Sequence, residues 1–340
     1  MANRSLKIIF AVTLVTIIGC IIVIGGIWSK YGAYGFGVIY RRGGSYWRVM
    51  TADDPRLSPA MRASLKTPQP DAVSGPIVWT TRSLGFETAE MPVIVEGKTL
   101  DVILLNRIDP ENYSFTVRNA PKGDIGIDEW EKELPDSLLI VNGSYFGLKG
   151  YPDTPVKMNG VFAGPSKYQA TAGAFVSRDG QADIIDLRRR NWNSALEHSE
   201  NAMVSYPLLI GDDGTTHVTT QSRWLANRTF VGKDTNGRII IGTTQDAFFN
   251  LDSLAKFLRK APLGLTLALN LDGGPIACQS VRIGAYHRKL YARWEAQVSG
   301  AGVKLLSWPL NSATWAMPMA LTVERRSDPM PEPGASIRKR

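Results

Sequence analysis

The feature that most constrains this chain is an uncharged run of 21 residues near its N-terminus, from Ile8 to Trp28. About 20 apolar residues in a helix cross the hydrocarbon core of a bilayer. The run therefore predicts one transmembrane helix, with residues 1–30 as a membrane anchor that contacts the membrane through residues 8–28. The alternatives are a cleaved signal peptide, whose apolar region is shorter, about 7–15 residues, and lipidation at Cys20, which the apolar residues after Cys20 disfavour.

The charges around this run give a weak indication of orientation. Arg4 and Lys7 precede it, whereas Lys30 follows it and Arg41 and Arg42 lie farther on. The positive-inside rule therefore favours a cytoplasmic N-terminus only slightly. We expect a single-pass membrane protein whose body is extracytoplasmic.

The formal net charge of +8 does not indicate nucleic-acid binding, because of where the charge lies. Residues 1–48 carry +6 and residues 325–340 carry +3, which leaves −1 for residues 49–324. A nearly neutral body lacks the basic surface that neutralises a phosphate backbone. No nucleic-acid partner is expected.

The rest of the chain divides by composition. Residues 31–76 are rich in Gly, Pro and Arg and predict a stalk, and residues 325–340 predict a disordered basic tail. Between them, residues 77–324 predict one domain built from short apolar runs bounded by Gly, Asn or Pro, a pattern typical of strands. We predict an α+β fold, a strand-rich mixed-sheet domain with few helices, preceded by one N-terminal transmembrane helix.

Local patterns support this class. The expected helices are Ile127–Leu134 and Leu251–Lys260, the second with apolar residues at helical spacing. A hairpin is expected from Arg228 to Gly242, because Asn236-Gly237 supplies turn residues that tolerate positive φ. The expected strands are Ile77–Thr81, Leu100–Leu105, Tyr113–Val117, Leu138–Val141, Ala172–Val176, Ile184–Leu187, Thr229–Val231, Arg238–Gly242 and Leu265–Leu271.

The most informative stretch covers residues 265–275, Leu-Thr-Leu-Ala-Leu-Asn-Leu-Asp-Gly-Gly-Pro. Alternate side chains of a strand point to opposite faces, so the leucines share one face and Asn270 and Asp272 share the other. Gly273 and Gly274 then allow a sharp turn and a close backbone approach to a ligand. The pattern fits either a ligand site at the strand end or an ordinary Asp-Gly-Gly turn.

Two further segments have similar chemistry. A predicted strand delivers Asn142 to Gly143, Ser144, Tyr145 and Phe146, in which the aromatic rings suit a sugar or else pack into the core. Arg228 enters the predicted hairpin, either as a solvated charge or as a planar fork for phosphate oxygens.

Together these segments resemble the phosphodiester glycosidase family, in order as well as in residues. The similar motifs are Asn142-Gly-Ser-Tyr-Phe146, Pro155-Val-Lys-Met-Asn-Gly160, Tyr206-Pro-Leu-Leu-Ile-Gly211, Arg228-Thr-Phe-Val-Gly232 and Asn270-Leu-Asp-Gly-Gly274. The chain departs from the family pattern at Ser144, at Val156 and at Pro275-Ile276, which leaves the identity of the substrate open.

The resemblance implies an enzyme that hydrolyses a sugar-1-phosphodiester of an envelope or secreted glycoconjugate at the glycosidic C–O bond, through an oxocarbenium-like transition state. In that interpretation Arg228 binds phosphate, Asp272 activates water or stabilises the oxocarbenium ion, and Asn142 orients oxygens. The substrate-binding residues would be Asn270, Gly273, Gly274, Gly143, Ser144 and Tyr145. The alternatives are a non-catalytic carbohydrate-binding or envelope-assembly protein, and a phosphodiesterase that breaks the P–O bond.

Other reactive residues have less support. Asp153 and Asp246 are reserve carboxylates, and Cys278 is expected to be a buried small hydrophobe. The three histidines are scattered, so no zinc motif is present. The cofactor is therefore unknown, and an oxygen-ligated Ca²⁺ or Mg²⁺ site that uses Asp272 stays open.

Overall fold

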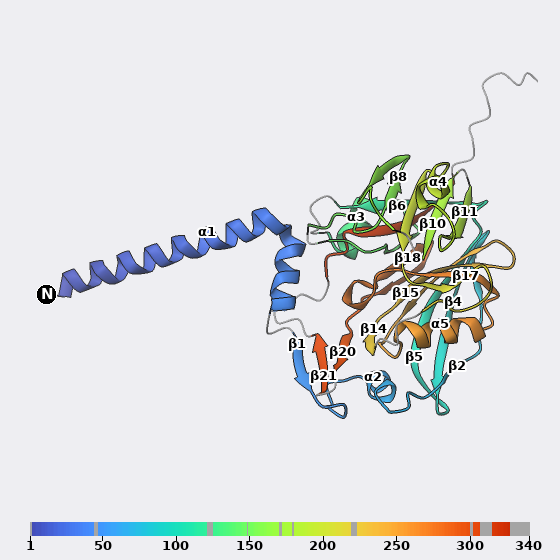
Figure 1. Cartoon of the computed structure of the whole chain (residues 1–340), viewed down its shortest axis with the longest axis horizontal. Helices are drawn as coiled ribbons and strands as arrows, with labels where there is room; N and C mark the ends of the chain where they lie inside the picture. Colours follow the sequence, from blue (N-terminus) through green and yellow to red (C-terminus); the bar gives the residue numbers. More distant parts are fainter. Residues whose placement is uncertain are drawn as a thin grey trace, which may run out of the picture.

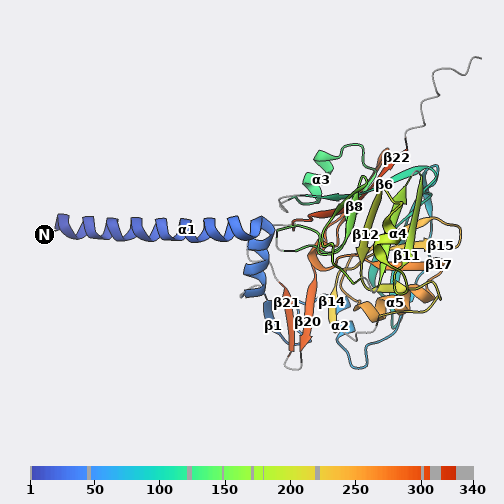
Figure 2. The same cartoon turned by 45° about the horizontal axis from the view of Figure 1, so that its top comes forward.

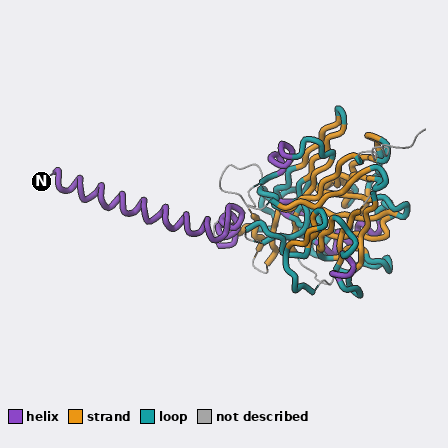
Figure 3. Tube along the Cα trace, turned by 90° about the horizontal axis from the view of Figure 1, so that it is seen from above, coloured by secondary structure: helices purple, strands orange, loops and turns teal. Residues whose placement is uncertain are grey.

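The structure is a computed structural model whose body consists mostly of strands (Figure 3). This confirms the predicted strand-rich α+β class. The residues that it describes are 2–43, 47–120, 125–147, 149–169, 172–178, 180–218, 223–299, 302–306 and 315–326.

The N-terminal part of helix α1 (Ala2–Gly43) projects away from this body (Figure 1). Its segment Leu6–Ser29 has 24 residues and is long and apolar enough to cross a membrane. None of the apolar window in that segment is buried against the rest of the chain. The helix is longer than the predicted anchor, residues 1–30.

The largest sheet has eight strands and carries two of the three motif segments. Its main order is β13-β17-β15-β16-β5-β4-β2, with β3 paired to β4. Its strands are β2 (Ala72–Ser74), β3 (Thr80–Ser83), β4 (Phe86–Val95), β5 (Lys98–Ile108), β13 (Leu208–Ile210), β15 (Thr229–Asp234), β16 (Ile239–Thr244) and β17 (Leu265–Asn270).

This sheet is buried on both faces. Along β17, Leu269 belongs to one hydrophobic cluster and Ala268 to another, as the period of two requires. The helix α5 (Leu251–Lys260) covers the second face with Leu254 and Phe257. The predicted helix, the leucine face of the strand and the β15–β16 hairpin are all confirmed.

Three smaller sheets complete the body (Figure 2). One has the order β11-β10-β12-β8-β9, with β8 (Val156–Met158), β9 (Val161–Ala163), β10 (Gly173–Arg178), β11 (Gln181–Asp186) and β12 (Asn201–Ser205). Another has the order β19-β18-β7-β22-β6, with β6 (Tyr113–Asn119), β7 (Leu139–Asn142), β18 (Gln279–Ile283), β19 (Tyr286–Leu290) and β22 (Met319–Arg325). The third, called here the small sheet, has the order β1-β21-β20-β14, with β1 (Trp47–Met50), β14 (Trp224–Ala226), β20 (Glu295–Ser299) and β21 (Gly302–Leu306).

The remaining helices are short. They are α2 (Pro59–Ser64), α3 (Ile127–Glu133), α4 (Trp192–Leu196) and the 3₁₀ turn η1 (Gly274–Ile276). Every strand pair in the described ranges is antiparallel, where the sequence analysis expected mixed sheets. The reason is local, because hairpins such as β4–β5 and β15–β16 return the chain directly to its neighbour.

The predicted stalk over residues 31–76 is corrected by the structure from Trp47 onward. Strand β1 pairs with β21, and β2 pairs with β4. Between them, Leu57 and Met61 are buried in the cluster that supports the small sheet. The segment packs on the body because its few apolar residues find partners that are distant in sequence. In the predicted tail, Arg325 ends β22, and residues 327–340 lie outside the described residues.

Candidate functional site

The three segments that carry Asn142, Arg228 and Asp272 meet around the backbone of Asp272, which follows β17. The Asp272 amide donates to the Gly143 carbonyl oxygen at 3.1 Å, and the Gly274 amide donates to the Asn227 carbonyl oxygen at 2.9 Å. The Gly273 amide donates to Asp272 Oδ1 at 2.8 Å. Asp272 itself is half-buried. The Asp-Gly-Gly turn therefore holds one carboxylate oxygen and presents the side chain where two other segments approach.

The side chain of Asn142 holds this turn through hydrogen bonds. Its side chain is fully buried. Nδ2 donates to the Asp272 carbonyl oxygen at 2.8 Å, and Oδ1 accepts from Thr229 Oγ1 at 2.7 Å. Because both ends of the amide are bonded within the protein, Asn142 positions Asp272, which differs from the predicted direct contact with substrate.

Arg228 lies beside the same turn and is mostly buried. Its Nη2 donates to the Trp224 carbonyl oxygen at 2.6 Å, and its Nε donates to the Phe249 carbonyl oxygen at 3.4 Å. A Cβ added at Gly273 would lie 3.3 Å from Arg228 Nη1, so the guanidinium lies against the glycine turn.

The electrostatic surroundings of Arg228 include acidic neighbours. Burial lowers the pKa of Arg228, whereas Tyr145, Glu295 and Asp272 act to raise it. An arginine stays protonated in proteins. The site therefore holds a fixed positive charge next to carboxylates.

An aromatic pair forms the other side of the site. The rings of Tyr145 and Tyr206 are stacked, with centroids 4.2 Å apart and planes 20° apart. The Tyr145 hydroxyl donates to the Tyr206 carbonyl oxygen and accepts from Asn270 Nδ2, both at 2.8 Å. Burial, followed by the charge of Asp272, raises the pKa of Tyr145, so the phenol remains neutral.

Asn270 is fully buried beneath this pair. Its Nδ2 also donates to the carbonyl oxygens of Tyr206 and Leu271, at 3.1 and 2.6 Å. Oδ1 has no hydrogen-bond partner among the described residues. Asn270 therefore orients the aromatic pair from within the core.

Two other predicted binding residues are buried in the turn after β7. Ser144 Oγ donates to the carbonyl oxygen of Val204 in β12 at 2.6 Å, so the hydroxyl is bonded within the protein. A Cβ at Gly143 would lie 3.1 Å from Met319 Cβ, so glycine permits close packing on β22. Gly274, in contrast, has φ +71°, a conformation that favours glycine, and it faces the site.

The two reserve carboxylates lie in different places. Asp153 is exposed at the aromatic side. Burial raises the pKa values of Tyr206 and Tyr168, and the charge of Asp153 adds to both increases. Asp246 accepts a hydrogen bond from Ser58 Oγ at 2.6 Å and so anchors the N-terminus of α2. Cys278 is buried as expected, and burial raises its pKa to about 11.

Sequence analysis missed the residues that the small sheet contributes. In β14, the carbonyl oxygen of Trp224 accepts a hydrogen bond from Arg228, and the indole Nε1 of Trp224 donates one to Glu295 Oε1 at 3.1 Å. Glu295 lies opposite Ala226 in the β14–β20 pair. No motif surrounds Glu295, so only the pairing of β14 with β20 reveals its place beside Arg228.

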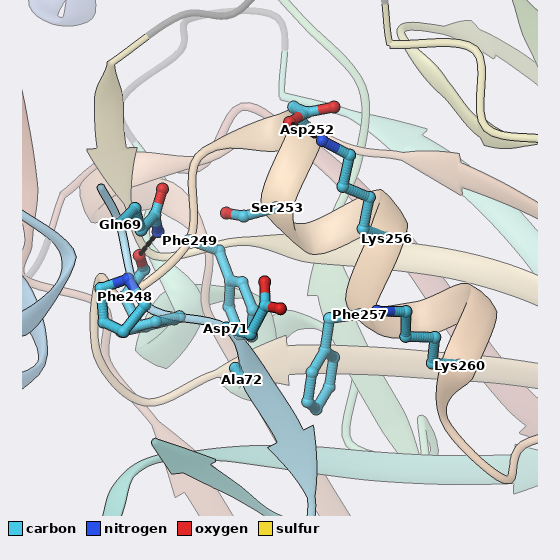
Figure 4. Close-up of a pocket in the computed structure, with 11 residues that line it drawn as sticks. Gln69, Asp71, Ala72, Phe248, Phe249, Asp252, Ser253, Lys256, Phe257 and Lys260 are labelled. Atoms are coloured by element: carbon cyan, nitrogen blue, oxygen red, sulfur yellow. Dashed lines mark hydrogen bonds and ion pairs between the residues drawn. The ribbon is translucent and has the colours of Figure 1, made fainter. Parts of the chain in front are cut away.

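A separate cavity of about 170 Å³ lies between α5 and residues 69–72 (Figure 4). It is lined by Asp71 on one side and by Lys256 and Lys260 of α5 on the other. None of the predicted site residues lines it. Within the described residues, no group of three or more His, Cys, Asp or Glu side chains suits a metal ion.

Comparison with known proteins supports the motif analysis. Residues 136–285 match the phosphodiester glycosidase family, which confirms the predicted resemblance over that segment. No protein of curated function matches the sequence.

Two similar solved structures have low identity to this chain. A hypothetical protein from Synechocystis has a TM-score of 0.47 and 14% identity over 74% of this chain and 64% of that one. The zebrafish N-acetylglucosamine-1-phosphodiester alpha-N-acetylglucosaminidase catalytic domain, auto-inhibited by its pro-peptide, has a TM-score of 0.45 and 15% identity over 82% of this chain and 88% of that one.

Proposed function

We propose that this chain is a membrane-anchored phosphodiester glycosidase that cleaves the glycosidic C–O bond of a sugar-1-phosphodiester in an envelope or secreted glycoconjugate. The observation that carries the proposal is the meeting of Asp272, Arg228 and the Tyr145–Tyr206 pair around one glycine turn. These groups match the three parts of such a substrate, namely the anomeric carbon, the phosphate and the sugar ring. The family match over residues 136–285 supports the same reaction class.

Arg228 would bind the phosphate group. Its Nε and Nη2 are directed to two backbone carbonyls, which fixes the plane of the guanidinium. A fixed planar donor in a partly dry site stabilises charge that develops on a departing phosphate. Gly273 lets the phosphate approach because a side chain there would meet Arg228 Nη1.

Asp272 would act at the anomeric carbon. The Gly273 amide and the Asn142 side chain hold the carboxylate and its backbone in place. As the C–O bond breaks, the sugar develops oxocarbenium character. A carboxylate at this point stabilises that charge or removes a proton from the attacking water.

The Tyr145–Tyr206 pair would bind the sugar. Tyr206 is 44% exposed, so its ring is available to a ligand while Tyr145 supports it from inside. Pyranose rings present C–H faces that pack on aromatic surfaces. Asn270 and Asn142 contribute indirectly by orienting these groups.

The proposed location is a single-pass anchor through Leu6–Ser29, with the body on the extracytoplasmic side. The apolar helix supports the anchor by its length and composition. Arg4 and Lys7 before the helix, together with the proposed glycoconjugate substrate, support this side of the membrane.

The test uses the full-length chain in detergent micelles with a panel of sugar-1-phosphodiesters in ¹⁸O-labelled water. Label in the released sugar supports C–O cleavage, whereas label in the phosphate product would identify a P–O phosphodiesterase. Binding of the panel without turnover would identify a carbohydrate-binding protein. Parallel reactions with Ca²⁺, with Mg²⁺ and with a chelator determine whether an ion is needed.

A further inference from the structure

Thr229 is a buried hydroxyl residue at the site and has no part in the function proposed above. It begins β15, and its side chain is fully buried. Its Oγ1 donates to Asn142 Oδ1 at 2.7 Å, and its carbonyl oxygen accepts from the Leu271 amide at 2.9 Å. Asn142 Nδ2 in turn donates to the Asp272 carbonyl oxygen at 2.8 Å. Thr229 therefore holds the segment around Asp272 twice, once through its backbone and once through Asn142.

The direction of these hydrogen bonds is fixed by groups that can only accept. Asn142 Nδ2 lies 2.8 Å from the Asp272 carbonyl oxygen and 3.3 Å from the Gly143 carbonyl oxygen, and neither carbonyl has a proton to donate. The amide nitrogen must therefore face these two carbonyls, which leaves the amide oxygen facing Thr229. Because an amide oxygen only accepts, the Thr229 hydroxyl must be the donor.

The neighbouring hydroxyl does not compete for this proton. Thr243 Oγ1, in β16, lies 3.4 Å from Thr229 Oγ1 and 3.5 Å from Gln279 Oε1. Both distances are long for a hydrogen bond between oxygens, whereas 2.7 Å between Thr229 Oγ1 and Asn142 Oδ1 is optimal. The single proton of the Thr229 hydroxyl is therefore committed to Asn142.

This hydrogen bond reaches the Asp272 carboxylate through one peptide group. The carbonyl oxygen of Asp272 and the amide N–H of Gly273 belong to the same planar unit, so holding the oxygen also fixes the N–H. That N–H donates to Asp272 Oδ1 at 2.8 Å. Gly273 and Gly274 give the following backbone more freedom than other residues would. The bond from Asn142 therefore restrains a turn whose own sequence is flexible, and Thr229 restrains Asn142.

We propose that Thr229 is a positioning residue for the Asp272 carboxylate, an inference that rests on the proposed glycosidase function. Thr229 acts through the Asn142 amide and sets the direction in which the carboxylate meets the anomeric carbon. A catalytic group displaced by about 1 Å can lose on the order of 10²-fold in rate. Binding of phosphate by Arg228 and of sugar by Tyr206 does not depend on this hydroxyl, whose bonded partner is Asn142.

The decisive variant is Thr229→Val in the full-length chain, which replaces the hydroxyl by a methyl group of similar size. Its kcat on an active sugar-1-phosphodiester should fall by roughly 10-fold to 10²-fold, while KM changes little. Thr229→Ser keeps the donor and should recover most of kcat. The matched control is Thr322→Val, a fully buried threonine of β22 whose Oγ1 accepts from Arg118 Nε at 3.1 Å. The control should keep the wild-type kcat at a temperature well below unfolding.

A double-mutant cycle tests the route through Asn142. Asn142→Ala should lower kcat, and adding Thr229→Val should cause no further loss, because residues that act in series are not additive. Losses that multiply would overturn the proposal, since Thr229 would then act by another route. If Asn142→Ala does not fold, the comparison of Thr229→Val with Thr229→Ser decides the question.

Two further results would contradict the proposal. A folded Thr229→Val with the wild-type kcat would show that the hydroxyl does not position Asp272, and equal losses in the valine and serine variants would assign the effect to packing. If Thr229→Val does not fold, Thr229→Cys replaces it, because a thiol is a weak donor; a kcat equal to that of Thr229→Ser would then refute the inference. A wild-type chain inactive on the whole panel refutes the glycosidase function itself, and this inference with it.

Discussion

The protonation of Asp101 is expected to control how the stability of the body depends on pH. This residue of β5 is 4% exposed. Its Oδ1 accepts the amide N–H groups of Val102 and Asp246, at 2.7 and 2.8 Å, and Oδ2 has no hydrogen-bond partner in the described part of the chain. Burial, followed by the charge of Asp246, raises the pKa of Asp101 from 3.8 to about 8.

The direction of the pH effect on stability follows from the number of protons bound in the folded and unfolded states. Between these two pKa values the folded chain keeps a proton that the unfolded chain has lost. The free energy of unfolding therefore falls as pH rises, by about 1.4 kcal/mol per pH unit. Between pH 5 and pH 8 the loss is on the order of 3–4 kcal/mol. At roughly 2–4 °C per kcal/mol, the melting temperature should fall by roughly 6–15 °C.

The substitution Asp101→Asn removes the ionisable group and keeps an oxygen for the two amide donors. The melting temperature of this variant should therefore fall much less between pH 5 and pH 8 than that of the wild type. The assay is tryptophan fluorescence during thermal unfolding of the full-length chain in detergent. Asp136→Asn, at an exposed turn, is the control for loss of one acid. Equal slopes for the wild type and Asp101→Asn would refute the reasoning.

Three other predictions concern the site and the anchor. Arg228→Lys should lower kcat/KM by roughly 10²-fold, because an ammonium group does not reproduce the planar fork; an unchanged kcat/KM on an active substrate would remove Arg228 from the site. Asp272→Asn should fold and lose hydrolysis by roughly a hundredfold; a folded, fully active variant would transfer the chemistry to another carboxylate, and an unfolded one would make Asp272 a structural turn residue. A reporter fused after Arg340 should be active on the extracytoplasmic side, and cytoplasmic activity would reverse the proposed orientation.

Local periodicity was sufficient to predict the elements that carry the motifs. Helix α5 has the predicted bounds Leu251–Lys260, because its apolar spacing, its Asn250 cap and its last-turn bases all agree. Strand β17 has the predicted leucine face, because two strongly apolar clusters fix its register. The meeting of Asn142, Arg228 and Asp272 followed only from the family resemblance.

Features that depend on pairing between distant residues were not predictable in this way. Strand β1 is only four residues long and pairs with β21, more than two hundred residues later. Glu295 reaches Arg228 for the same reason, through β14 and β20. Burial likewise changes the interpretation of Ser144. Its polar side chain suggests a ligand contact, but in the structure its hydroxyl donates a hydrogen bond to the Val204 carbonyl oxygen.

The site spans two parts of the body that have separate hydrophobic clusters. Asp272 follows β17, which is enclosed by the two large clusters, whereas Glu295 begins β20 of the small sheet, supported by the cluster of Met50, Leu57 and Leu225. Local opening of a protein follows such units, and a unit with fewer buried apolar residues opens at lower free energy. A ligand that touches both carboxyl groups therefore acts as a cross-link between a firmly folded scaffold and a sheet that is easier to detach, and part of its binding free energy goes into keeping that sheet in place.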